Sequence, residues 1–266
     1  MAPVETTSNV RTPAVAGLFY PDDPGQLRRV VTGFLDGAID PSHECFKCFI
    51  LPHAGYIYSG PVAGTGYRQL RPQWDRIRRV VILGPSHRMA FRGLAFSSHS
   101  AFATPLGTIP VDEEAIDAVR DLPQVVELDP AHQQEHSVEV HLPFLQVVFR
   151  DFKLVPLVVG DARETEVAEA INCLWGGEET CFVISSDLSH FHDYQTAGAE
   201  DRRTADRIQS LKAVVPDQAC GAVPLNGLLH VGRERGLKMR LLDLRNSGDT
   251  AGPRNRVVGY GAFAMG

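Results

Sequence analysis

The chain has 266 residues, of which 44% are hydrophobic and 22% charged, and its formal net charge is −6. These values are ordinary for a globular protein and allow one large domain or two small ones. The negative net charge argues against a nucleic-acid partner, because nucleic-acid-binding proteins bind through a basic surface that displaces counterions. No apolar run approaches the roughly 20 residues of a membrane helix, so we expect no membrane partner either.

The N-terminal residues lack a basic stretch followed by an apolar core, so we expect no secretory signal and a cytoplasmic location. An odd number of cysteines, five, indicates free thiols rather than a disulfide framework. Cys45 and Cys48 have the spacing of redox and zinc motifs, but they lead into a strand, where residues three apart face opposite sides. No second such pair completes a zinc site, so we assign this pair no function.

Residues 1–10 are expected to be loose, with a single domain over residues 11–266. An extended anchor at 16–21 precedes a helix with Asp23 as N-cap and Pro24 as its first residue. Glycines at 60, 64 and 66 do not match a dinucleotide or Walker pattern, so we expect a small-residue helix packed closely on the sheet. Further helices are expected at 113–122, 164–175, 197–214 and 220–235, and further strands at 154–160, 239–244 and 257–264.

Three short apolar runs rich in β-branched residues each end in polar residues that include a histidine. The runs are 49–51, leading to His53; 80–83, leading to His87; and 182–184, leading to His190. Runs that are apolar on both faces suit central strands of a sheet covered by helices on both sides. If these strands are parallel, their carboxyl ends share the edge where open α/β sheets bind ligands. We therefore predict an α/β fold with a mostly parallel central sheet, in which the three histidines converge.

Residues 132–141 contain three histidines and two glutamates. His132 to His136 even fits the H-x-x-E-H pattern of inverted zinc peptidases. That motif needs a regular helix with both histidines on one face, and Pro143 and nearby β-branched residues weaken a long helix here. A zinc peptidase is therefore a distant alternative, in which His132 and His136 control the metal content.

Two neutral imidazoles and one carboxylate on one face of a divalent metal leave positions open for substrate and oxygen, as in non-haem Fe(II) oxygenases. His53 and His87 are the candidate imidazole ligands, and Asp249, in a loop after a strand, is the candidate third ligand. The rivals for this third position are Asp161 and Asp187. His190 is then free to act as acid or base, because the ordinary pKa of histidine lies near neutrality. A lone histidine at a strand end is more often structural, so the metal site is a hypothesis that three such ends support.

Five motifs occur in a fixed order along the chain. They are Ala-Gly-Leu-Phe-Tyr-Pro at 16–21, Pro-His-Ala-Gly-Tyr at 52–56, Gly-Pro-Ser-His at 84–87, Glu-His-Ser-Val-Glu-Val-His-Leu-Pro at 135–143 and Ser-Ser-Asp-Leu-Ser-His at 185–190. From about residue 11 to the C-terminus, the chain resembles the Memo family, called AmmeMemoRadiSam system protein B in bacteria and archaea. The resemblance implies a single α/β domain similar to the LigB-type, class III extradiol dioxygenases, which open catechol rings with Fe(II) and oxygen.

The resemblance carries His53 and His87 over as metal ligands and His190 as the counterpart of the dioxygenase acid-base histidine. It makes His141 and Asp187 neighbours of the site. It also implies iron or copper as the metal, and an association with a radical-SAM protein and an AMMECR-type protein.

The third ligand is where this sequence departs from the family pattern. Animal members place a cysteine at that position and the dioxygenases a glutamate, whereas this chain offers Asp249 or Thr250. A carboxylate would preserve an iron-like facial site, and the lack of a thiolate in that loop weakens the case for copper(I).

We therefore expect a Memo-family metalloprotein, with Fe(II) as the first choice of metal and copper as the second. It would act as a dioxygenase-like oxidoreductase on a small, catechol-like aromatic substrate. The alternative from another class is a non-catalytic binding or scaffold protein that presents the same pocket to a metal or peptide, because shared architecture does not transfer a reaction.

Overall fold

The computed structural model describes residues 9–41 and 44–266. The loose segment expected at the N-terminus falls, for residues 1–8, outside the described residues. Val10 and Arg11 form strand β1 (Val10–Arg11), which pairs in parallel with β5 (Ala101–Thr104). The start of the described chain therefore pairs with a segment about 90 residues further on.

The centre of the fold is a run of four parallel strands. In spatial order they are β2 (Cys48–Leu51), β9 (Thr180–Ser185), β3 (Arg79–Pro85) and β8 (Lys153–Val159). Apart from the first residues of β3 and β8, every residue in these strands is buried. This confirms the predicted α/β fold and explains the runs that are apolar on both faces.

Antiparallel and short strands extend this core on both sides. β12 (Val257–Met265) pairs antiparallel with β2, and both β11 (Met239–Asn246) and β10 (His190–His192) pair antiparallel with β12. On the other side, β4 (Leu94–Phe96) pairs antiparallel with β8 and parallel with β7 (Val125–Glu127). A separate small sheet has the order β1, β5, β6 (Gly107–Pro110). The sheets are thus mixed around a parallel centre.

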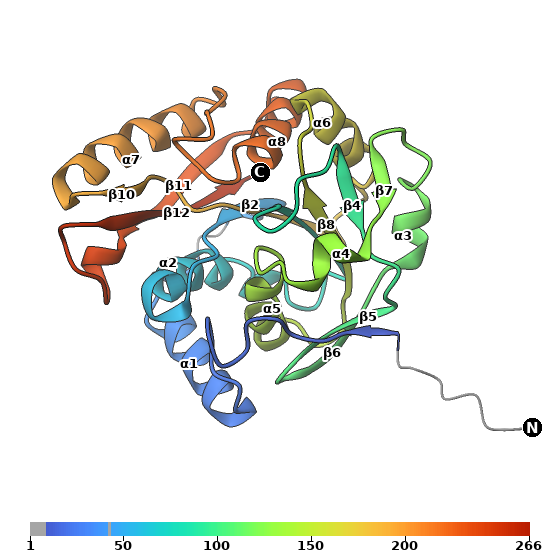
Figure 1. The fold of residues 1–266 in the computed structure, drawn as a ribbon, viewed down its shortest axis with the longest axis horizontal. Coiled ribbons are helices and arrows are strands. Elements are labelled where there is room, and N and C mark those ends of the chain that lie inside the picture. The colour runs from blue at the N-terminus through green and yellow to red at the C-terminus, as the bar shows by residue number, and fades with distance from the viewer. Residues whose placement is uncertain (1–8, 42–43) are drawn as a thin grey trace, which may run out of the picture.

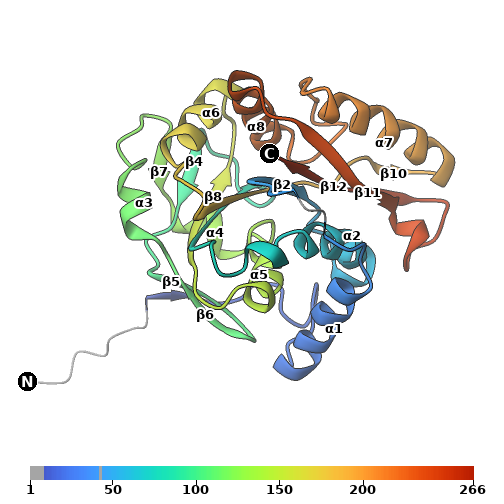
Figure 2. The same ribbon diagram turned by 180° about the vertical axis from the view of Figure 1, so that it is seen from behind.

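Helices cover both faces of the large sheet (Figures 1 and 2). One face carries α1 (Pro24–Asp36), α2 (Tyr56–Arg68) and α5 (Leu142–Val148), and the other carries α6 (Glu164–Cys173), α7 (Tyr194–Gln209) and α8 (Ala222–Arg235). Short helical turns α3 (Glu113–Asp117), α4 (Asp129–Gln133), η1 (Arg71–Gln73), η2 (Glu139–His141) and η3 (Ser247–Asp249) lie in the connections.

Caps account for where the helices begin. Asp23 accepts a hydrogen bond from the backbone N–H of Gln26, as predicted for the N-cap of α1. Helix α7 starts earlier than the expected residue 197, because the Asp193 carboxylate caps the backbone N–H groups of Gln195 and Thr196.

The glycines of α2 let this helix approach its neighbours closely. A Cβ on Gly64 would lie 2.7 Å from the backbone oxygen of Phe34 in α1, and one on Gly66 would lie 2.1 Å from the side chain of Leu51 in β2. The expected close packing on the sheet is therefore accompanied by close packing on α1. Since α2 begins three residues after His53, this packing fixes the turn that carries that histidine.

A buried ion pair joins the N-terminal segment to the loop after α4. The guanidinium of Arg11, 3% exposed, donates to the carboxylate of Glu139, 1% exposed. It also donates to the backbone oxygens of His132, at 2.9 Å, and Glu135, at 2.7 Å. One side chain thereby binds three points of the segment from 132 to 139.

The carboxylate of Glu139 is fully engaged on its other sides. It accepts hydrogen bonds from the hydroxyl of Tyr20, at 2.5 Å, and from the backbone N–H groups of Ala14, at 2.7 Å, and Val15, at 3.0 Å. A buried carboxylate needs this many partners, because an unpaired charge in the interior costs several kcal/mol.

Replacement of Arg11 by Met should therefore lower the free energy of unfolding by about 3–5 kcal/mol, because Glu139 would stay buried without its countercharge. Urea unfolding followed by circular dichroism measures this change. Arg76→Met is the matched control, since Arg76 pairs with Glu178 at the surface, and its unfolding midpoint should stay near that of the wild type. Equal midpoints for Arg11→Met and the wild type would contradict the role assigned to the pair.

Candidate metal centre

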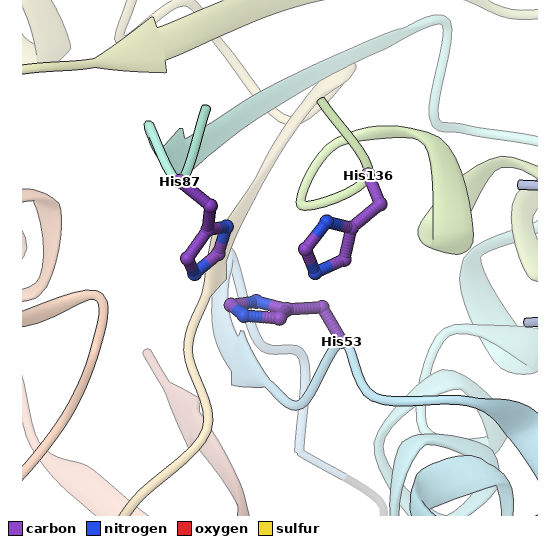
Figure 3. Close-up of side chains that lie close together, drawn as sticks. All are labelled: His53, His87 and His136. Atoms are coloured by element: carbon purple, nitrogen blue, oxygen red, sulfur yellow. The ribbon is translucent and has the colours of Figure 1, made fainter. Parts of the chain in front are cut away.

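Three histidine side chains converge at the carboxyl edge of the parallel strands (Figure 3). His53 follows β2, His87 follows β3, and His136 lies in the loop after α4. One ring nitrogen from each lies within 4.8 Å of those of the other two. The His53 side chain is 2% exposed, whereas those of His87 and His136 are 29% and 12% exposed. A group of this kind can hold one metal ion and leave one side of it open.

Ser185, the last residue of β9, fixes the protonation of His53. Its hydroxyl donates its one proton to the backbone oxygen of Ser137, at 2.6 Å. It must therefore accept from Nδ1 of His53, at 2.6 Å, and from Nε2 of His141, at 2.9 Å. His53 thus carries its proton on Nδ1, which leaves the lone pair on Nε2 free to bind a metal.

His141 supports this arrangement from the end of η2. Because its Nε2 donates to Ser185, its Nδ1 accepts from the hydroxyl of Tyr67, at 2.9 Å. Burial lowers the pKa of His141 to about 3, so the ring stays neutral. His141 is therefore separated from His53 by a single hydroxyl and acts on the group through Ser185.

Glu135 anchors His87. Its carboxylate accepts from Nδ1 of His87, at 2.9 Å, and from the backbone N–H of the same residue, at 2.6 Å. The backbone N–H groups of His136 and Ser137 donate to it as well, both at 2.9 Å. Burial raises the pKa of Glu135, but the hydrogen bonds from His87 and Ser137 outweigh burial and bring it to about 2. The ionised carboxylate orients His87 with Nε2 free, which is the carboxylate–histidine pairing found behind metal ligands.

The residues of the group suit a transition metal. Burial and then the neighbouring histidines lower the pKa of His53 well below its usual value, and burial lowers the pKa of His136 to about 4. Neutral imidazole is the form that binds metals such as iron, copper and zinc. Nδ1 of His136 is buried and lies 3.4 Å from the Glu135 carboxylate, without a hydrogen bond to any described residue. The set of three imidazoles fits a bound transition-metal cation.

Asp187 and His190 lie close to the group without belonging to it. The Asp187 carboxylate accepts from the backbone N–H of His53, at 2.8 Å, and its second oxygen lies 4.0 Å from Nε2 of His53. Burial raises the pKa of Asp187 to about 7, although the hydrogen bond from His53 opposes this shift. His190 donates from Nδ1 to the backbone oxygen of Leu188, at 2.8 Å, so its Nε2 remains available to accept a proton.

The structure does not bring the predicted third ligand to the group. The Asp249 carboxylate is exposed and accepts hydrogen bonds from the hydroxyl of Tyr194, at 2.6 Å, and from the backbone N–H of Asn246, at 2.9 Å. Thr250 donates to the backbone oxygen of Ser247, and Asp161 is exposed beside β4. His136 instead stands beside His53 and His87.

A cleft of about 670 Å³ opens beside the centre. His190, Arg203 and Cys220 are among the residues that line it. Sγ of Cys220 lies 3.3 Å from Nε2 of His53, so this cysteine stands between the cleft and the histidine group. A small molecule bound there would contact His190 and Cys220.

Comparison with known proteins gives a match over nearly the whole chain. A family model described as Memo-like protein matches residues 11–264. The chain belongs to the Memo family. It is 34% identical to a MEMO1 family protein of Methanothermobacter thermautotrophicus, over 94% of this chain and 98% of that protein. It is also 35% identical to one of Sulfolobus acidocaldarius and 34% identical to one of Thermotoga neapolitana, each over 94% of this chain and 97% or 98% of theirs.

The described helices of this Memo-family chain do not include one that is both long and apolar enough to span a membrane.

The second histidine of the peptidase-like pattern, His136, joins the metal group, whereas the first does not. Helix α4 ends at Gln133, so His132 and His136 do not share one helix face. Nε2 of His132 donates to the backbone oxygen of Ala95, at 3.0 Å, in the interior beside β4. The regular helix that the peptidase motif requires is therefore missing from this segment.

Sequence reasoning considered His136 only as a zinc-peptidase ligand, and it assigned nothing to Glu135, Ser185 or Cys220. The first two lie in the Glu-His-Ser-Val-Glu motif, and the density of histidines and glutamates there was the available signal. Ser185 lies in the Ser-Ser-Asp motif, in which the sequence points to Asp187 as the residue beside the site. For Cys220 the sequence offers no signal, because its partner His53 is 167 residues away.

Acidification should destabilise the Memo-family fold through His132. Burial lowers the pKa of His132 to about 4 from the usual 6.5, so unfolding takes up a proton between these values. The stabilising effect is present above pH 6.5 and is lost as the pH falls toward 4. We expect the wild type to lose about 2 kcal/mol more than His132→Gln between pH 7 and pH 5, by urea unfolding. Equal losses in the two proteins would show that His132 titrates normally in the native state.

Replacement of Ser185 by Ala should weaken metal binding about 10–100-fold, because His53 would lose the hydroxyl that holds its proton on Nδ1. Competition with a chelating dye gives the affinity, and ¹⁵N chemical shifts of the histidine rings report the tautomer. Ser98→Ala serves as the control, since Ser98 pairs with Asp129 far from the group. A Ser185→Ala protein with unchanged affinity and tautomer would refute this assignment.

Proposed function

We propose that this protein is a metal-dependent oxidoreductase of the dioxygenase type, with Fe(II) as its first metal and copper as its second. The observation that carries the proposal is the set of three converging imidazoles, two of which are oriented by Ser185 and Glu135 with Nε2 unprotonated. Rigid orientation of this kind is typical of metal ligands and unnecessary for histidines that only fill space.

The donor set supports a late or middle transition metal. Three neutral nitrogens favour iron, copper, nickel or zinc over magnesium or calcium, which prefer oxygen ligands. Asp187, 4.0 Å from His53, is the nearest carboxylate that can balance the charge of a divalent ion. Three protein ligands leave coordination positions for substrate and oxygen, which is why we favour redox chemistry over a structural role.

The residues around the group have separable tasks in such a reaction. His53, His87 and His136 would hold the metal, which supplies Lewis-acid activation of a bound hydroxyl and electron transfer. His190 would accept the hydroxyl proton at Nε2, since its Nδ1 is committed to Leu188. The cleft of about 670 Å³ has room for one substituted aromatic ring. We therefore propose a small, catechol-like substrate.

The first test is metal content after anaerobic purification, measured by mass spectrometry. We expect near-stoichiometric iron in the wild type and none in a His53→Ala/His87→Ala double variant. A His99→Ala/His230→Ala variant is the control, because these histidines pair with surface acids, Asp129 and Glu164. If neither the wild type nor the variant holds metal after Fe(II) or Cu(I) is supplied, the metal-centre proposal is wrong.

The same preparations test the reaction. Iron-loaded wild type exposed to oxygen should convert a catechol to its ring-opened product, and His190→Ala should reduce the rate about 10²–10⁴-fold while keeping its iron. A protein that holds iron and binds catechols without consuming oxygen would instead be a binding protein using the same pocket.

A further inference from the structure

The protonation of His190 depends on the backbone of the two residues before it. Its Nδ1 donates to the backbone oxygen of Leu188, at 2.8 Å, so Nε2 is the nitrogen open to a proton. The backbone oxygen of Leu188 must therefore stay in one position if His190 is to act as an acid or base. Any contact that fixes residues 188 and 189 also fixes which ring nitrogen of His190 carries the proton.

Strand β12 holds one side of this segment. The backbone N–H of Leu188 donates to the backbone oxygen of Gly259, and the backbone N–H of Gly259 donates to that of Ser189, both at 2.8 Å. Regular pairing with β12 is interrupted directly after these bonds, because the register shifts between His190 and His192. The histidine thus lies at the point where the strand contacts become irregular.

Phe191 adds backbone strain at this irregularity. Its φ is 67°, in the left-handed region that a bulky residue rarely adopts. Its side chain is not held by burial, since the residue is 60% exposed and the guanidinium of Arg256 lies over its ring at 4.2 Å. Strained backbone persists only where the surrounding structure holds it. The segment before Phe191 therefore needs an anchor besides β12.

Asp201 of helix α7 supplies a contact from the other side. Its Oδ1 accepts a hydrogen bond from the backbone N–H of Ser189, at 3.0 Å, and the residue is 2% exposed. The helix lies so close to β12 that a Cβ on Gly259 would be 2.1 Å from Oδ2 of Asp201. The carboxyl group therefore contacts both members of the pair that Ser189 forms with Gly259.

The surroundings of Asp201 suit a hydrogen-bond acceptor more than a charge. Its Oδ2 is buried and has no hydrogen-bond partner in the part of the chain that the structure describes. Burial raises the pKa of the Asp201 carboxyl, although the hydrogen bond from the backbone of Ser189 opposes this shift. A buried carboxyl with an unsatisfied oxygen is unfavourable for stability alone. This cost points to a task for the bond that Oδ1 makes.

We propose that Asp201 is the positioning residue for the acid–base histidine: by fixing Ser189, it keeps the backbone oxygen of Leu188 at Nδ1 of His190. The inference rests on the proposed function, in which His190 moves the proton, and adds to it a residue outside the metal group. Asp201 is not among the residues that line the cleft or form the histidine group. Its replacement should therefore alter the His190 tautomer and the rate, and leave the metal content unchanged.

The tautomer of His190 in the full-length metal-free protein tests the proposal. Ring ¹⁵N chemical shifts report it at about pH 8, where imidazole is neutral, and His190→Gln assigns the signals. We expect the proton on Nδ1 in the wild type. In Asp201→Ala the signals should shift toward the Nε2-protonated form that an unrestrained imidazole prefers. Asp201→Asn keeps an acceptor oxygen and should restore the wild-type signals, whereas Asp206→Ala, an exposed position on the same helix, should not change them.

Gly259→Ala provides a second variant that leaves the carboxyl group in the protein. Its methyl group would lie 2.1 Å from Oδ2 of Asp201 and so must displace that side chain from Ser189. We expect the same change of His190 tautomer as in Asp201→Ala. This variant decides the question if circular dichroism shows that Asp201→Ala does not fold.

Kinetics separate this inference from the proposed function. In the iron-loaded protein, Asp201→Ala should lower kcat for catechol opening about 10²-fold, because a misplaced acid–base group costs that much, while KM and iron content stay near those of the wild type. Wild-type tautomer signals in both Asp201→Ala and Gly259→Ala would overturn the positioning role. A wild type that opens no catechol, with the tautomer changes as expected, would overturn the reaction and leave the placement of His190 by Asp201 intact.

Discussion

The buried pair of Arg11 and Glu139 is the contact on which the site depends most. These residues are 128 positions apart, and the guanidinium also binds the backbone of His132 and Glu135. Residues 134–138 connect α4 to Glu139 and carry His136. They form no helix or strand that would hold this histidine in place. A charge buried in the interior must be paired, so the N-terminal segment and this loop have to fold against each other.

A second set of contacts converts this packing into defined chemistry. Ser185 and Glu135 each accept a hydrogen bond from Nδ1 of a histidine, and neither belongs to the group of three histidines itself. Their hydrogen bonds leave Nε2 of His53 and of His87 free to bind a metal. The parallel order of β2, β9 and β3 brings these residues to one edge, where Ser185 ends the strand between the two histidines.

Much of the architecture was predictable because burial leaves a periodic trace in the sequence. The apolar runs before His53, His87 and His190 became central strands, and Asp23 capped α1 as its residue type indicated. The third member of the group was harder to predict. Asp249 follows a strand, as a ligand would, but its carboxylate is used within its own turn. His136 follows no strand, so a rule based on strand ends could not select it.

The sequence by itself determined the fold class, the Memo-family motifs and the two histidines at the ends of β2 and β3. These features are local, because a buried strand and the polar residues at its end are consecutive in the sequence. Only the tertiary structure decided which other side chains meet them. His136, Glu135 and Cys220 reach the site through contacts between distant segments, and pairings of that kind leave no periodic pattern along the chain.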